Sequence, residues 1–180
     1  MTIDNLTTTV EGLRNQALAA KGTFNTHRAT IMADTRLTPI GRKEALDELR
    51  ASTNATLAKL GSAESEAIDA ALLATRRKIA GTVAGNDDII SFRDAQDRAD
   101  SLTDARDAAR IMDRALLTGD KPLAAAVMGR AVSEGWRDVT DRYAQDNPAS
   151  AMDYNDQAAI VAFRDNLQQV FQRGAHYAAV

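Results

Sequence analysis

The sequence predicts an all-α protein in which a long antiparallel N-terminal α-hairpin is followed by a bundle of about four shorter helices. The first observation is composition: alanine is common, only 4% of the 180 residues are aromatic, and there are three prolines. Alanine has the highest helix propensity, and its small side chain lets helices pack closely. The second observation is that apolar residues recur at helical spacing through the first 80 or so residues.

The first helix is predicted over about residues 4–33. Its apolar seam advances in alternating steps of four and three residues, a heptad-like pattern that favours a coiled-coil-like pairing. The seam consists of Leu6, Val10, Leu13, Ala17, Ala20, Phe24, His27 and Ile31. Gly12 and Gly22 each lower helix stability by roughly 1 kcal/mol relative to alanine. We therefore expect this helix to depend on a packing partner.

The second helix is predicted from about residue 39 to 80, and its start is marked by four residues. Thr38 is a good N-cap, and Pro39 suits the first helical position. Leu37 precedes the cap and can pack onto the first turn, which contains Gly41. Because the connection to the first helix is short, the two helices should form an antiparallel hairpin.

The second helix carries an apolar stripe with a mean spacing of about 3.67 residues and polar members 11 residues apart. The stripe consists of Leu46, Leu49, Thr53, Leu57, Leu60, Glu64, Ile68, Leu72, Thr75 and Ile79. Gly61 and Ser62 mark a candidate kink. At 1.5 Å per residue the second helix spans about 60 Å and the first about 45 Å. The far end of the second helix must therefore pack on the C-terminal half or on another chain.

A break over residues 81–86, GTVAGN, predicts a boundary between two domains. Residues 1–81, the long hairpin, carry 11 basic and 9 acidic residues, whereas residues 82–180 carry 11 and 16. Most acids of this acidic helical bundle are aspartates, which favour caps over helix interiors. Shorter helices are accordingly predicted near residues 88–99, 103–118, 121–145 and 150–175.

The sequence contains no motif for catalysis, for a cofactor or for a metal ion. There is no cysteine, no phosphate-binding glycine loop and no HExxH pattern. Neither histidine has a nucleophile pattern beside it: His27 falls on the seam, and His176 lies near the C-terminus. We therefore predict a protein that is not an enzyme and has no catalytic, cofactor-binding or metal-binding residues.

Five aspartates at three- and four-residue spacing offer an alternative, a divalent-cation site in a carboxylate bundle. They are Asp94, Asp97, Asp100, Asp104 and Asp107. Arginines alternate with them, and no Glu-x-x-His pair completes a di-iron site. A solvated, salt-bridged helix face is the favoured interpretation.

The net charge of −3 argues against nucleic-acid binding, which needs a basic surface. No apolar run approaches the roughly 20 residues that cross a bilayer, so we expect no membrane partner. The first residues, MTIDNLTTTVEGL, lack the basic and apolar pattern of a secretion signal. The expected location is the cytoplasm rather than the secretory route.

Two groups of bulky residues are candidates for contacts with a partner protein. Trp136, the only tryptophan, and Tyr143 lie in the predicted third helix. Phe163, Leu167 and Phe171 belong to an apolar stripe near the C-terminus. For Trp136 and for the C-terminal stripe, packing in the core is the more common role of such residues, and contact with a partner is the alternative.

The stretch RLTPIGRKEALDEL resembles the L-[ST]-P-x-G-[RK] start of long helices in small structural and assembly proteins of tailed bacteriophages of high-GC, actinobacterial-type hosts. The resemblance rests on Leu37, Thr38, Pro39 and Gly41, together with the composition of the chain. It implies no active site and a role in the virion or in its assembly. That role can be scaffolding, head–tail joining, tail assembly or a minor capsid position, although a basic C-terminal helix typical of scaffolding proteins is missing.

Two functions from different classes therefore compete. The first is a non-enzymatic virion structural or assembly protein that contacts other phage structural proteins or itself, as a homo-oligomer, in the host cytoplasm during assembly or in the virion. The second is a bacterial helical adaptor or regulatory protein that binds one partner through a groove near Trp136.

Overall fold

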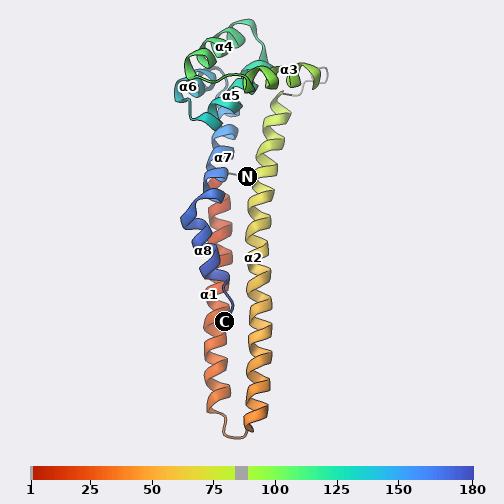
Figure 1. Ribbon diagram of the computed structural model, residues 1–180, viewed down its shortest axis with the longest axis vertical. Coiled ribbons are helices and arrows are strands. Elements are labelled where there is room, and N and C mark those ends of the chain that lie inside the picture. Colours follow the sequence, from red (N-terminus) through yellow and green to blue (C-terminus); the bar gives the residue numbers. More distant parts are fainter. Residues whose placement is uncertain (1, 84–88) are drawn as a thin grey trace. The chain divides into compact units, whose positions relative to one another are not determined.

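The computed structural model describes residues 2–83 and 89–180, and within these ranges the chain forms eight helices and no strand (Figure 1). The predicted all-α class is confirmed, with two long helices first and shorter ones after them. The helices are α1 (Ile3–Ala33), α2 (Pro39–Val83), α3 (Ile89–Asp100), α4 (Ala105–Thr118), α5 (Lys121–Glu134), α6 (Arg137–Asp146), α7 (Pro148–Asp165) and α8 (Leu167–Tyr177). The predicted break over residues 81–86 lies partly outside the described residues, and α2 extends to Val83.

The chain divides into two compact units, each of which combines distant parts of the sequence. Residues 2–70 and 163–180 form the first, here called the hairpin unit. Residues 71–162 form the second, the bundle unit. This division differs from the predicted one at residue 81, because the last residues of the chain fold with the hairpin and the end of α2 folds with the shorter helices.

In the hairpin unit, α1 and the first part of α2 lie side by side and are joined by a short turn (Figure 1). Helix α2 begins at Pro39, as predicted, and the Thr38 hydroxyl accepts a hydrogen bond from the Gly41 amide at 3.1 Å. The carboxylate of Asp34 accepts a bond from the Arg36 amide at 2.8 Å and so shapes the turn. These local hydrogen bonds explain why the long helix starts so abruptly.

The predicted apolar stripes match the observed burial closely. All ten stripe residues of α2 are buried or half-buried. Of the eight predicted seam residues of α1, only His27 is exposed, so its placement on the seam is wrong. Helix α1 instead buries Arg14, which is 8% exposed and was not predicted to be buried.

The bundle unit packs the end of α2 with α3, α4, α5, α6 and most of α7. Its core contains many alanines together with Met112, Met128 and Tyr154. Ile79 of α2 packs against this core. The far end of α2 therefore packs on the C-terminal half of the chain, which is one of the two possibilities expected from its length. Asp104 and Asp120 cap α4 and α5, in line with the capping role expected of the aspartates.

Two of the predicted shorter helices are each divided in two, so six helices follow the hairpin rather than about four. The predicted helix 121–145 is interrupted at Gly135, whose positive φ of 73° ends α5. The predicted helix 150–175 is interrupted at Asn166, whose side chain caps α8 by accepting bonds from the Gln168 and Gln169 amides. The second break separates α8 from α7 and allows it to pack on the hairpin.

No helix in the described ranges is long and apolar enough to span a membrane.

Candidate functional site

The most unusual feature of the hairpin unit is a fully buried carboxylate. Glu64 lies on the stripe of α2 between Leu60 and Ile68 and is 0% exposed. Placing an ionised carboxylate in an apolar seam is costly unless charged or polar partners satisfy it. The side chains that surround Glu64 are therefore central to the stability of this unit.

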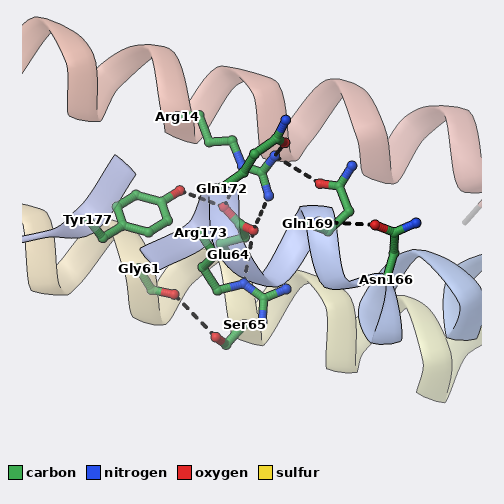
Figure 2. A network of polar contacts seen from close by, with 9 residues as sticks. All are labelled: Arg14, Gly61, Glu64, Ser65, Asn166, Gln169, Gln172, Arg173 and Tyr177. Carbon is green, nitrogen blue, oxygen red and sulfur yellow. Dashed lines mark hydrogen bonds and ion pairs between the residues drawn. The ribbon is translucent and has the colours of Figure 1, made fainter. Parts of the chain in front are cut away.

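Helix α1 provides the first partner, Arg14 (Figure 2). Its Nη2 lies 2.8 Å from Glu64 Oε1, and its Nε lies 3.1 Å from Glu64 Oε2. Two parallel bonds from one guanidinium to one carboxylate are among the strongest polar contacts in proteins. The pair therefore fixes the register between α1 and α2.

Helix α8 provides the remaining partners (Figure 2). Arg173 Nε donates to Glu64 Oε1 at 3.1 Å, and the Tyr177 hydroxyl donates to Glu64 Oε2 at 2.8 Å. The side-chain oxygens of Gln169 and Gln172 accept bonds from Arg14 Nη1 at 2.9 and 2.8 Å. Four residues of α8 thus complete a network that α1 and α2 begin.

This network keeps Glu64 ionised. Burial by itself raises the pKa of Glu64, but the hydrogen bonds from Arg14, Tyr177 and Arg173 and the charge of Arg14 lower it more, so the pKa lies below its ordinary value. The pKa of Tyr177 is raised, first by burial and then by its bond to the Glu64 carboxylate. Because Glu64 is ionised, enclosed and fully bonded, we interpret it as a structural group and not as a general base.

Contacts at the C-terminal end hold α8 in a defined direction. Lys21 Nζ donates to the Ala175 carbonyl at 3.0 Å, and the Val180 amide donates to Asn54 Oδ1 at 2.9 Å. Since Arg14 meets the first half of α8 and Lys21 meets its end, α8 runs parallel to α1.

The ring of Tyr177 packs closely on Gly61 of α2. A Cβ added at Gly61 would lie 3.3 Å from this ring. Gly61, which the sequence offered as a candidate kink, makes room for this ring.

The two faces of α8 are reversed relative to an ordinary surface helix. Its inner face, against the hairpin, is polar and consists of Gln169, Gln172, Arg173, His176 and Tyr177. Its outer face is apolar: Leu167 is 85% exposed, Phe171 is 77% exposed, and Val170 is also exposed. Surface helices normally bury the apolar face and expose the polar one. Exposed apolar clusters of this kind mark interaction sites.

The outer face of α8 is our candidate functional site, and it contains two of the five predicted contact residues, Leu167 and Phe171. A third, Phe163, is half-buried in the hairpin unit and lines a hollow of about 420 Å³ together with Val10 and His176.

The other two predicted contact residues belong to the bundle unit. Trp136 is half-buried and packs against the bundle core. Tyr143 is buried, with its ring edge-on to Tyr154 at a centroid distance of 6.0 Å. The structure therefore does not bring the five residues together in one compact unit.

The row of aspartates considered as a cation site is exposed. Asp94 pairs with Arg98 at 3.9 Å and Asp107 with Arg110 at 3.2 Å, as expected of a salt-bridged face. Within the described part of the chain, no group of three or more His, Asp or Glu side chains is arranged to hold a metal ion.

Comparison of the chain with models of known families, with curated proteins and with solved structures gives no match. A function must therefore be inferred from the residues and their geometry. The partners of Glu64 were not predicted, although Glu64 itself was placed on the stripe of α2. Nothing in the sequence links position 64 to Arg14 or to a helix more than 100 residues later.

Proposed function

We propose that this chain is a non-enzymatic structural or assembly protein of a tailed phage, which works through contacts between helices. The observation that carries the proposal is the orientation of α8, which turns its polar face toward the hairpin and its apolar face outward. Its polar face is bound to the hairpin through Arg173 and Tyr177, and its apolar face, with Leu167 and Phe171, is left for a partner. The resemblance at Leu37, Thr38, Pro39 and Gly41 gives the context of virion assembly.

Several features support a role without catalysis. The deeply buried acid Glu64 is fully engaged by structural hydrogen bonds. Its arginine partners, Arg14 and Arg173, both donate hydrogen bonds to its carboxylate. We infer that the network serves to present the outer face of α8 rigidly, as an interaction surface requires.

The adaptor alternative has less support. It needs an accessible groove near Trp136, but Trp136 is partly covered by the bundle core and its neighbour Tyr143 is buried. On the outer face of α8, by contrast, Leu167 is 85% exposed and Phe171 is 77% exposed. We therefore favour the assembly role. The same proposal includes action in the host cytoplasm during assembly and a place in the virion.

Deleting the gene from the phage genome that carries it tests this proposal. We expect the yield of infectious particles to collapse and incomplete heads or tails to accumulate, as seen by electron microscopy. Complementation with Leu167→Glu should fail, whereas Leu117→Glu, which alters a leucine that is 87% exposed on α4, should restore growth. A normal particle yield without the gene would rule the proposal out.

A further inference from the structure

Bulky and small residues are separated along the outer face of α8. The bulky residues Leu167, Val170 and Phe171 occupy its first half. Gly174 and Ala175 follow at the same helical spacing, Ala178 comes directly after the last residue of α8, and all three are exposed. One half of the face therefore protrudes and the other half is flat.

This separation makes the face complementary to itself. If a second α8 lies antiparallel across it, with a twofold axis beside the midpoint between Gln172 and Arg173, each bulky residue meets a small one. The matched pairs are Leu167 with Ala178, Val170 with Ala175, and Phe171 with Gly174. Twofold interfaces require this kind of match, since the same patch must fit its own copy.

We propose that the outer face of α8 binds the same face of a second copy of this chain in an antiparallel, twofold-symmetric pair. This inference rests on the proposed assembly role and deepens it by naming the partner. Gly174 and Ala175 let the two backbones approach closely, and Phe171 fills the space above the partner's glycine.

Charge favours a second copy over a strongly charged partner. Arg173 is the only arginine, lysine or acidic residue of α8, and it points inward to Glu64 (Figure 2). The hairpin unit, which carries this face, contains ten basic and ten acidic residues, so the surroundings of the face are neutral overall. Near-zero net charge promotes association.

The size of the face sets the expected strength. The exposed parts of Leu167, Val170 and Phe171 amount to roughly 300 Å² per copy, well below the ~800 Å² per partner of a stable complex. We therefore expect weak, concentration-dependent pairing. Within an assembly, where other contacts hold copies close together, a weak contact of this kind becomes effective.

The first test measures solution mass by light scattering and sedimentation over a wide concentration range. The wild-type chain should approach twice the monomer mass, and Phe171→Ala should raise the Kd about tenfold. Gly174→Phe should also weaken pairing, because two phenylalanines would then collide. A Cβ added at Gly174 meets nothing within 4 Å in its own chain, and the position is exposed, so the monomer should tolerate the substitution.

A double variant separates shape matching from simple loss of stability. In the Phe171→Ala, Gly174→Phe chain a phenylalanine again faces a small residue across the axis, so pairing should recover relative to either single variant. Helix content by circular dichroism should remain that of the wild type in all three. Failure of the double variant to recover, with helix content unchanged, would overturn the proposed register.

The absence of cysteine allows a second, covalent test. Single variants Leu167→Cys and Ala178→Cys should form a disulfide quickly when mixed and oxidised, and slowly when each is alone, because antiparallel pairing places position 167 opposite 178. Rapid cross-linking of Leu167→Cys with itself would indicate parallel pairing and would overturn the proposal.

A single-chain mass at every concentration would also overturn it. The proposed assembly role would survive such a result if particles still failed to form without the gene, since α8 would then bind a different protein.

Discussion

The carboxylate of Glu64 and the guanidinium of Arg14 lie 2.8 Å apart in the hairpin unit, although 50 residues separate them in sequence. Both side chains are nearly inaccessible to solvent. Their pairing joins α1 to α2, and the same carboxylate also receives Arg173 and Tyr177 from α8. One buried charge thus determines how three helices meet, and the following predictions test its consequences.

Replacing Glu64 by glutamine should destabilise the hairpin unit by about 3 kcal/mol, because Arg14 and Arg173 would be left without a counter-charge. Urea unfolding followed by circular dichroism measures the change. Glu66→Gln is the matched control, since Glu66 is exposed on the same helix, and it should alter the unfolding free energy by less than about 0.5 kcal/mol. Equal effects of the two substitutions would contradict the structural role of Glu64.

The contribution of Glu64 should depend on pH. Its pKa in the folded protein lies below the ordinary value of 4.5, so its stabilisation is complete above that value and is lost as the pH falls through the folded pKa. The difference in unfolding free energy between wild type and Glu64→Gln should therefore be constant near neutral pH and shrink below about pH 4.5. A difference that persists unchanged into strong acid would show that the Glu64 charge is not involved.

All three tyrosines should ionise above their ordinary pKa of 10 in the folded protein. Burial raises the pKa of Tyr143 and Tyr154, and burial and the Glu64 bond raise that of Tyr177. An alkaline titration followed by phenolate absorbance should show no group with an ordinary pKa until the helices unfold. In denaturant all three should titrate normally. If one tyrosine of the folded protein titrates with an ordinary pKa, and the Tyr177→Phe substitution removes that titration, α8 is not docked on the hairpin.

Two glycines on the hairpin should respond oppositely to alanine. Gly22 is exposed and an added Cβ there meets nothing within 4 Å, so Gly22→Ala should stabilise the protein by about 1 kcal/mol through helix propensity. At Gly61 the Cβ would lie 3.3 Å from the Tyr177 ring, so crowding should offset most or all of that gain. Thermal unfolding compares the two, and equal gains would argue against the packing of Tyr177 on Gly61.

Much of the fold could be predicted from local patterns. The spacing of Leu57, Glu64, Ile68 and their neighbours identified the buried face of α2, because helical periodicity specifies which residues share a side. Thr38 and Pro39 identified its start, because capping depends on residues close in sequence. The breaks at Gly135 and Asn166 were missed because a single glycine or asparagine is also compatible with a continuous helix.

The candidate site was predictable only in part. Leu167 and Phe171 were identified as contact residues from their apolar spacing, but that pattern is equally compatible with burial. Which face of α8 is exposed depends on what its opposite face binds, and that is a buried carboxylate more than 100 residues earlier in the chain.

By itself, the sequence determined the helical class, the two long helices and the residues that share each stripe, since these follow from propensity, capping and periodicity within a few turns. Only the tertiary structure decided that Glu64 pairs with Arg14, that α8 joins the hairpin unit, and that its apolar face remains exposed. The physical reason is that periodicity shows which residues share one side of a helix. The partner of a buried charge, in contrast, depends on packing between segments far apart in sequence.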